Sequence, residues 1–257
     1  MNDTIEAVLR TNMERLILGA AKLGLPLNPG QVEQFHTYYD ELLDWNRRVN
    51  LTALTDYEEV QIKHFLDSLT VTLALKQPIG DEGLRFIDVG AGAGFPGIPL
   101  KILLPTIKLT LLEATAKKAA FLQHLRRKLG LDDVEIIVGR AEDIAHKAQY
   151  REKFDIVLSR AVASLPTLAE LTLPFCAIGG SFVAQKKGTI DLEISQAAKA
   201  IGLLGGKLRE AKRVDLEEFT DERWLITIDK VLPTPQPYPR RPGIPAKRPI
   251  LDKQSKQ

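Results

Sequence analysis

Three observations predict an α/β fold, in which N-terminal helices precede a mostly parallel seven-stranded sheet. Apolar residues recur at helical spacing over the first 80 of the 257 residues. From residue 84 onward, short β-branched runs alternate with helical segments, the pattern of a parallel sheet covered on both faces. The last two runs follow each other without an intervening helix, which predicts an antiparallel pair at the sheet edge.

The helical region is expected to span residues 1–80. Asn28 is a predicted N-cap and Pro29 falls in the first turn, where a missing N–H costs little. A later helix is predicted after "NLTAL", where Thr55 and Glu58 have capping-box spacing. The segment "KQPIGDEG" then interrupts the apolar pattern, so we place a domain boundary there.

The second domain is expected to span residues 81–232. Its predicted strands are "LRFIDVG", "KLTLLEA", "VEIIVGR", "FDIVLSRA", "GSFVAQK", "KLREAKRVDL" and "RWLITIDKV". Helices are predicted between the first six strands, over residues 97–104, 116–129, 142–148, 164–173 and 189–204.

Residues 233–257 form a basic, proline-rich tail. Seven prolines exclude a regular helix or central strand, and six basic residues accompany one acidic residue. The whole chain has a formal charge of only +2, so positive charge is concentrated in this tail. Such a tail suits a polyanion, although a solvated end of the chain is the simpler interpretation.

The single cysteine, Cys176, excludes an intrachain disulfide and favours the cytoplasm. It lies in the apolar run "LTLPFCAIGG", which predicts a buried structural thiol. The N-terminal sequence does not resemble a signal peptide, and no run approaches the ~18 apolar residues of a membrane span. We therefore expect no membrane contact, and nothing indicates an obligate oligomer.

The stretch "FIDVGAGAGFPGIPL" marks the predicted ligand site. Gly90, Gly92 and Gly94 follow the first strand directly, at the sheet edge where parallel α/β folds bind ligands. Glycines there permit a sharp turn and a close approach of the backbone to a ligand. Gly92, Gly94 and Gly97 also satisfy GxGxxG, so a dinucleotide remains an alternative on the glycines alone.

Acidic residues at neighbouring strand ends narrow the choice of ligand. Asp88 precedes the loop, where its carboxylate can meet a cationic ligand, and Glu113 ends the second strand, where it can accept ribose hydroxyls. Ala141 and Glu142 follow the third strand, at the expected place of an adenine. Each acid could instead be a helix N-cap, but together they favour S-adenosylmethionine.

Five segments in order resemble one family. They are "NLTALTDYEEVQIKHFLDSL", "FIDVGAGAGFPGIPLKI", "LLEATAKKAAFL", "FDIVLSRAVASLPTLAEL" and "YPRRPGIPAKRPI". The likeness is to the bacterial methyltransferases that modify N7 of a guanine in 16S ribosomal RNA, a family also known as glucose-inhibited division protein B. It implies a Rossmann-like S-adenosylmethionine-dependent methyltransferase fold and covers the chain from about residue 31.

The resemblance also implies roles for individual residues. In the family the glycine loop holds the methionine part of the cofactor, which corresponds here to Gly90 and Phe95. The remaining implied cofactor contacts are Glu113, Ala114 and Thr115 after the second strand, Ala141 and Glu142 after the third, and Arg160 in "SRAV". Arg160 is also the candidate catalytic residue.

A methyl transfer to guanine N7 needs no general base, because N7 carries a free lone pair. Of the four histidines, His64 in "IKHFLDSL" is the one of interest, and a structural hydrogen bond is its simpler interpretation. RNA is expected to bind basic residues after the fifth strand and in the tail: Lys186, Lys187, Arg240, Arg241, Lys247 and Arg248. The expected partner is 16S rRNA within the small ribosomal subunit or an assembly intermediate. Alternatives are an NAD-dependent enzyme and a non-catalytic RNA-binding or assembly factor on the same fold.

Overall fold

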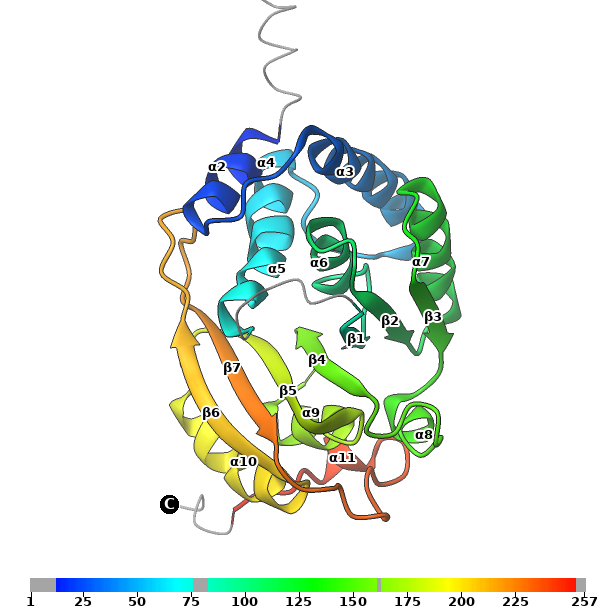
Figure 1. Cartoon of the computed structure of the whole chain (residues 1–257), viewed down its shortest axis with the longest axis vertical. Coiled ribbons are helices and arrows are strands. Elements are labelled where there is room, and N and C mark those ends of the chain that lie inside the picture. Colours follow the sequence, from blue (N-terminus) through cyan, green and yellow to red (C-terminus); the bar gives the residue numbers. More distant parts are fainter. Residues whose placement is uncertain (1–12, 76–82, 161–162, 253–257) are drawn as a thin grey trace, which may run out of the picture.

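The computed structural model describes residues 13–75, 83–160 and 163–252. Within this part of the chain, a seven-stranded sheet lies between two layers of helices (Figure 1). The strands follow the order β3-β2-β1-β4-β5-β7-β6, and β7 runs antiparallel to both of its neighbours. Their bounds are β1 Arg85–Val89, β2 Lys108–Glu113, β3 Val134–Val138, β4 Phe154–Arg160, β5 Cys176–Lys187, β6 Gly206–Arg213 and β7 Arg223–Lys230. The predicted fold class is confirmed, including the antiparallel pair.

The parallel strands are aligned so that their carboxyl ends share one edge. Val89 of β1 pairs with Leu112 of β2, and Asp88 pairs with Leu158 of β4. The loops after β1, β2, β3 and β4 therefore emerge side by side. This edge of the sheet carries the site.

Three helical segments precede the sheet in the described chain. They are α2 (Glu14–Lys22), α3 (Pro29–Val49) and a continuous segment made of α4 (Tyr57–Val60), a π-helical turn (Gln61–Leu66), α5 (Asp67–Leu69) and a 3₁₀ turn (Thr70–Ala74). Asn28 caps α3 as predicted, and the structure adds a reciprocal capping box with Gln31. The cap of α4 is Asp56 and not Thr55, since the Asp56 carboxylate accepts the Glu59 N–H at 2.9 Å.

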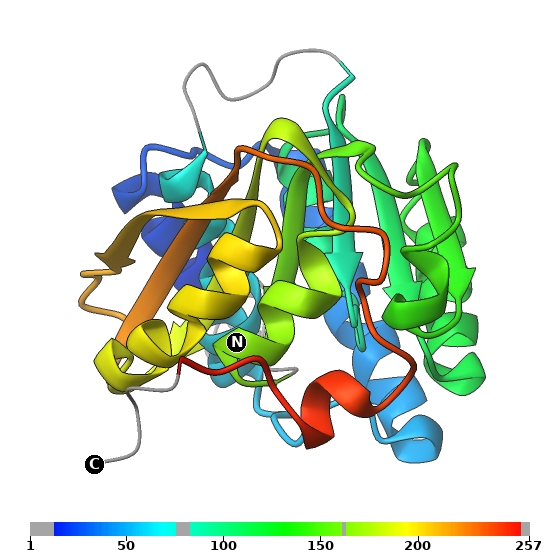
Figure 2. The same ribbon diagram turned by 90° about the horizontal axis from the view of Figure 1, so that it is seen from below.

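Helices cover both faces of the sheet (Figure 2), and each face carries a separate hydrophobic core. The N-terminal helices, α6 (Gly97–Leu103) and α7 (Ala116–Lys128) cover one face, and Phe35 and Leu122 belong to its core. On the other face lie α8 (Ala141–Ile144), α9 (Leu165–Thr172) and α10 (Asp191–Leu203). The expected domain boundary near residue 80 lies outside the described residues, so that division stays a prediction.

The tail crosses the face covered by α9, ending in the red segment of Figure 2. It contains one short helix, α11 (Ile244–Lys247), where the sequence excluded a regular helix. Pro245 fits because it stands in the first turn, where no intrahelical N–H is required. The Arg240 guanidinium forms a two-point ion pair with the fully buried Glu170 carboxylate of α9. The tail is thereby fixed to the sheet domain.

Two further expectations concern Cys176 and membranes. Cys176 is buried, and burial raises the pKa of its thiol to about 12, as a structural cysteine requires. None of the helices described is both long and apolar enough to cross a membrane. Within the same residues, no cluster of three His, Cys, Asp or Glu side chains is arranged to hold a metal ion.

Candidate active site

The glycine loop connects β1 to α6 in a left-handed backbone conformation. Gly90, Gly92 and Gly94 have φ angles of 78°, 58° and 96°, which only glycine adopts readily. Gly90 and Gly92 line a pocket, as expected for a close approach to a ligand. Gly94 is required for a different reason, because a Cβ there would lie 2.8 Å from the Tyr38 hydroxyl of α3. Close packing against Tyr38 of α3 and Ile98 of α6 therefore accounts for Gly94.

A pocket of about 400 Å³ opens at the carboxyl edge of the sheet. Residues from the loops after β1 and β2 and from the end of β4 line it together with three residues of the N-terminal region. These residues are Leu51, Thr52, His64, Gly90, Ala91, Gly92, Ala93, Phe95, Glu113, Ala114, Lys118 and Arg160. Sequence reasoning missed Leu51 and Thr52, which belong to the recognised segment "NLTAL" but carry no chemistry that points to a site.

Glu113 holds the loop and faces the pocket. Its carboxylate accepts the Gly92 N–H at 2.9 Å and the Thr115 N–H at 2.8 Å, and the residue is 6% exposed. Two backbone donors leave lone pairs of the carboxylate for further donors such as hydroxyl groups. Thr115 itself is the N-cap residue of α7 and is exposed.

Asp88 lies behind the loop and is fully buried. Its Oδ2 accepts the Gly97 N–H at 2.9 Å, while Oδ1 has no hydrogen-bond partner among the described residues. Burial raises the pKa of this carboxyl to about 7, against the opposing effect of the Gly97 hydrogen bond. Asp88 thus joins β1 to the start of α6, and its contact with a ligand stays a prediction.

A second pocket of about 240 Å³ adjoins the first, since Gly90 and Ala114 line both. Ala141 and Glu142 line it, as expected for an adenine site. The tail supplies another part of its wall through Gly243 and Ala246. The Glu142 carboxylate accepts the Gly243 N–H at 2.9 Å, which fixes the tail to this wall. The basic composition of the tail pointed to RNA and carried no signal for this role.

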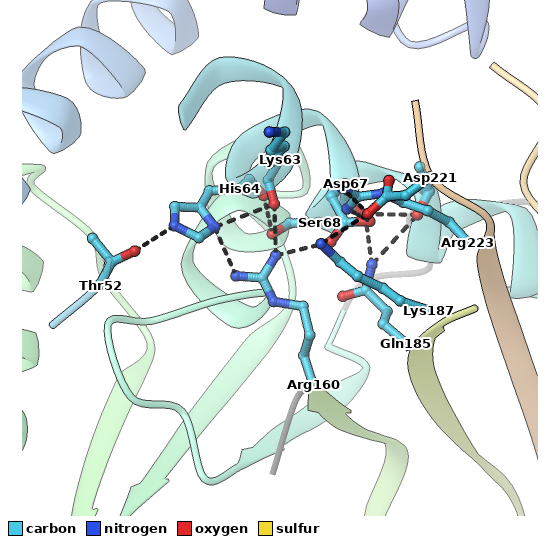
Figure 3. Close-up of polar contacts among 11 residues, drawn as sticks. Thr52, Lys63, His64, Asp67, Ser68, Arg160, Gln185, Lys187, Asp221 and Arg223 are labelled. Atoms are coloured by element: carbon cyan, nitrogen blue, oxygen red, sulfur yellow. Dashed lines mark hydrogen bonds and ion pairs between the residues drawn. The ribbon is translucent and has the colours of Figure 1, made fainter. Parts of the chain in front are cut away.

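Arg160 reaches the first pocket from the end of β4 (Figure 3). Its guanidinium lies over the Phe95 ring, 4.9 Å from the ring centroid, and pairs with Asp67 at 3.0 Å. Cation–π contact and ion pairing together fix the direction of this charged group. The sequence placed Arg160 here, but it did not reveal the partner, Asp67.

His64 stacks on the same Phe95 ring, beside the Arg160 guanidinium. Its ring lies 4.5 Å from Phe95, and Nε2 is 2.7 Å from the Thr52 hydroxyl, so the expected structural hydrogen bond is confirmed. Burial, followed by the nearby Arg160 charge, lowers the pKa of His64 to about 3. The imidazole is therefore neutral near pH 7 and also lines the pocket.

Known proteins resemble this chain over most of its length. A family described as GidB, rRNA small subunit methyltransferase G, matches residues 31–220. The chain belongs to this family. A ribosomal RNA small subunit methyltransferase G of Dehalococcoides mccartyi is 55% identical over 93% of this chain and 100% of its own length. The protein of that name from Roseiflexus castenholzii is 49% identical over the same shares.

Solved structures share the fold of this family member at low sequence identity. A mutant of MtNAS in complex with S-adenosylmethionine has a TM-score of 0.51 at 13% identity, covering 76% of this chain and 73% of that chain. The [4+2]-cyclase SpnF has a TM-score of 0.52 at 15% identity, covering 81% and 98%. Because one of these is a cyclase, the fold alone does not define the reaction.

The six basic residues predicted to bind RNA differ in their exposure and in their ion-pair partners. Lys186 is largely buried and binds Glu193 at 2.7 Å, while Arg240 binds Glu170. Lys187 is half exposed, paired with Asp221 at 3.2 Å. The other three, Arg241, Lys247 and Arg248, are exposed on the tail.

Proposed function

We propose that this protein transfers a methyl group from S-adenosylmethionine to N7 of one guanine in 16S ribosomal RNA, within the small ribosomal subunit or an assembly intermediate. One observation carries the proposal. In a chain of the rRNA small subunit methyltransferase G family, two adjoining pockets lie at the carboxyl edge of the sheet with a carboxylate at the end of β2.

The residues present fit the cofactor. Gly90, Gly92 and Phe95 would hold its methionine part, and the free lone pairs of Glu113 would accept the ribose hydroxyls. Ala141 and Glu142 line the second pocket, which would take the adenine. The two pockets adjoin at Gly90 and Ala114, as an elongated ligand with both parts requires.

When bound, S-adenosylmethionine supplies a methyl group on a positively charged sulfur. The lone pair of guanine N7 needs no deprotonation, so the protein has to orient the two reactants and exclude water. Orientation of this kind supplies up to about 7–11 kcal/mol of the barrier. Phe95 and Leu51 give the first pocket apolar walls, and the neutral His64 adds no charge to it.

Arg160 supplies a positive charge of fixed direction at this pocket. A guanidinium can hold a carboxylate, a phosphate or the edge of a guanine, and it stays protonated at every relevant pH. Its position beside Phe95 places it where any of these groups would enter. We assign it to binding and orientation of the reactants.

RNA contact is assigned to the exposed basic side chains. Lys187, Arg241, Lys247 and Arg248 are accessible to phosphates, while the charges of Lys186 and Arg240 are bound to carboxylates of the fold. Such contacts position RNA without reading its sequence. We propose that the protein acts as a monomer in the cytoplasm, where its rRNA substrate is assembled.

The test uses purified protein, tritiated S-adenosylmethionine and small subunits from cells that lack the encoding gene. Labelled positions are mapped by cleavage at 7-methylguanine. Label at one 16S guanine, and none with subunits from wild-type cells, is the expected result. If S-adenosylhomocysteine binds but neither the subunits nor free 16S rRNA are labelled, the proposal that 16S rRNA is the substrate is refuted.

A further inference from the structure

Asp67 is a buried carboxylate at which the N-terminal helical segment meets three neighbouring strands (Figure 3). It is 4% exposed and begins α5, directly after the π-helical turn. Oδ2 pairs with Arg160 of β4 at 3.0 Å, and Oδ1 pairs with Arg223 of β7 at 2.7 Å. Its carbonyl oxygen accepts the side-chain amide of Gln185 on β5 at 2.6 Å. The carboxylate therefore has little freedom to move.

The polar contacts of the Arg160 guanidinium come from this same segment. Beside its contact with Asp67 at 3.0 Å, Nη1 lies 3.4 Å from the Lys63 carbonyl oxygen, and Nη2 lies 3.4 Å from His64 Nδ1. Asp67 makes the shortest of these contacts and the one with a formal negative charge. The π-helical turn, a deviation often found at functional sites, brings the three groups to one side of the helix.

His64 is the third neighbour of the guanidinium. Its Nδ1 lies 3.4 Å from Arg160 Nη2 and 3.2 Å from the Lys63 carbonyl oxygen, and its Nε2 lies 2.7 Å from the Thr52 hydroxyl. The imidazole therefore stands between the guanidinium and Thr52, while Asp67 neutralises the positive charge of Arg160.

We propose that Asp67 is a positioning residue, which holds the Arg160 guanidinium across Phe95 in the orientation that receives the ligand. Arg223 fixes the second oxygen of Asp67 and is itself held by Asp221 at 2.8 Å. The inference depends on the proposed function only in that Arg160 lies in the ligand pocket. A purely structural role, joining the N-terminal segment to the sheet, is the interpretation that has to be separated from it.

The experiment is a double-mutant cycle between Asp67→Asn and Arg160→Ala in the full-length protein. Calorimetry measures the dissociation constant of S-adenosylhomocysteine for each protein, and urea unfolding measures stability separately. We expect Asp67→Asn to weaken binding about tenfold or more in the wild-type background and less than twofold when Arg160 is already alanine. An equal loss of affinity in the wild-type and Arg160→Ala backgrounds, or no loss of affinity in the wild-type background, would overturn the proposal.

Two matched variants keep this test decisive. Asp229→Asn alters a carboxylate that pairs with Arg209 at the opposite end of β7, and should leave binding unchanged. If Asp67→Asn does not fold, Asp67→Asn/Arg223→Met removes both buried charges together and is compared with Arg223→Met alone. The dissociation constant of S-adenosylhomocysteine for Asp67→Asn/Arg223→Met should be about ten times that for Arg223→Met alone. A ratio near one contradicts the proposal. Methylation by wild-type protein is scored independently, so failure of the proposed reaction would not be mistaken for failure of Asp67.

Discussion

Replacement of Arg240 by alanine should reveal how firmly the tail is fixed. The Glu170 carboxylate is fully buried and accepts two short side-chain contacts, from Nε at 2.9 Å and Nη2 at 2.6 Å. Alanine leaves it with the backbone N–H of residue 240 at 2.8 Å. Breaking a buried pair costs about 3–5 kcal/mol, and the 29% exposure of the Arg240 side chain favours the lower end, about 3 kcal/mol. For a chain of this size, that lowers Tm by roughly 6–12 °C.

Urea unfolding and calorimetric melting of wild type and Arg240→Ala measure this loss. The double variant Glu170→Gln/Arg240→Ala should recover much of the lost stability, because Glu170→Gln removes the buried charge. Arg85→Ala is the control, since its pair with Asp155 is solvent-exposed and is worth at most about 1 kcal/mol. A loss below about 1 kcal/mol for Arg240→Ala, or a double variant no more stable than the single one, would refute the reasoning.

The remaining predictions concern the first strand and its loop. Gly94→Ala should lower stability by about 2–4 kcal/mol in urea unfolding, because a Cβ would lie 2.8 Å from the Tyr38 hydroxyl at a positive φ; a neutral result would show that the helices yield. Gly92→Val should abolish S-adenosylhomocysteine binding in calorimetry, whereas Gly179→Val, at an exposed positive-φ glycine outside the pocket, should not; similar affinities would contradict the pocket assignment. For Asp88, the native carboxyl with its pKa of about 7 binds protons more tightly than the unfolded one, so its contribution to stability falls as pH rises from about 4 to 7. Wild type should therefore lose stability relative to Asp88→Asn between pH 5 and 8, and a constant difference in urea unfolding would exclude that titration.

The sheet and the position of the pocket were predictable because they depend on local patterns. Apolar runs of alternating type define the strands, and the loop after β1 has few places to lie other than the carboxyl edge. Gly90, Gly92 and Glu113 were placed at the pocket from their positions relative to strand ends, whereas Arg160 was placed there by the family resemblance of "SRAV".

What the sequence could not show depends on contacts between distant segments. Asp67 resembles an ordinary helical acid until folding brings Arg160, far along the chain, within 3.0 Å. Gly94 has the same pattern as its neighbours, yet only the folded positions of Tyr38 and Ile98 show that packing demands it. Arg240 and Arg241 are adjacent basic residues, and only the buried Glu170 separates a structural role from an exposed one.

The walls of the two pockets come from parts of the chain that are synthesised at different times. Leu51 and Thr52, synthesised early, line the first pocket, while Gly243 and Ala246, synthesised late, close the second. A chain that stops before Gly243 contains all seven strands but lacks one wall of the second pocket. Because a ligand stabilises only the state that binds it, a cofactor that contacts both pockets should protect a chain that includes Ala246 more strongly than one that stops before Gly243. Synthesis thus completes the site last.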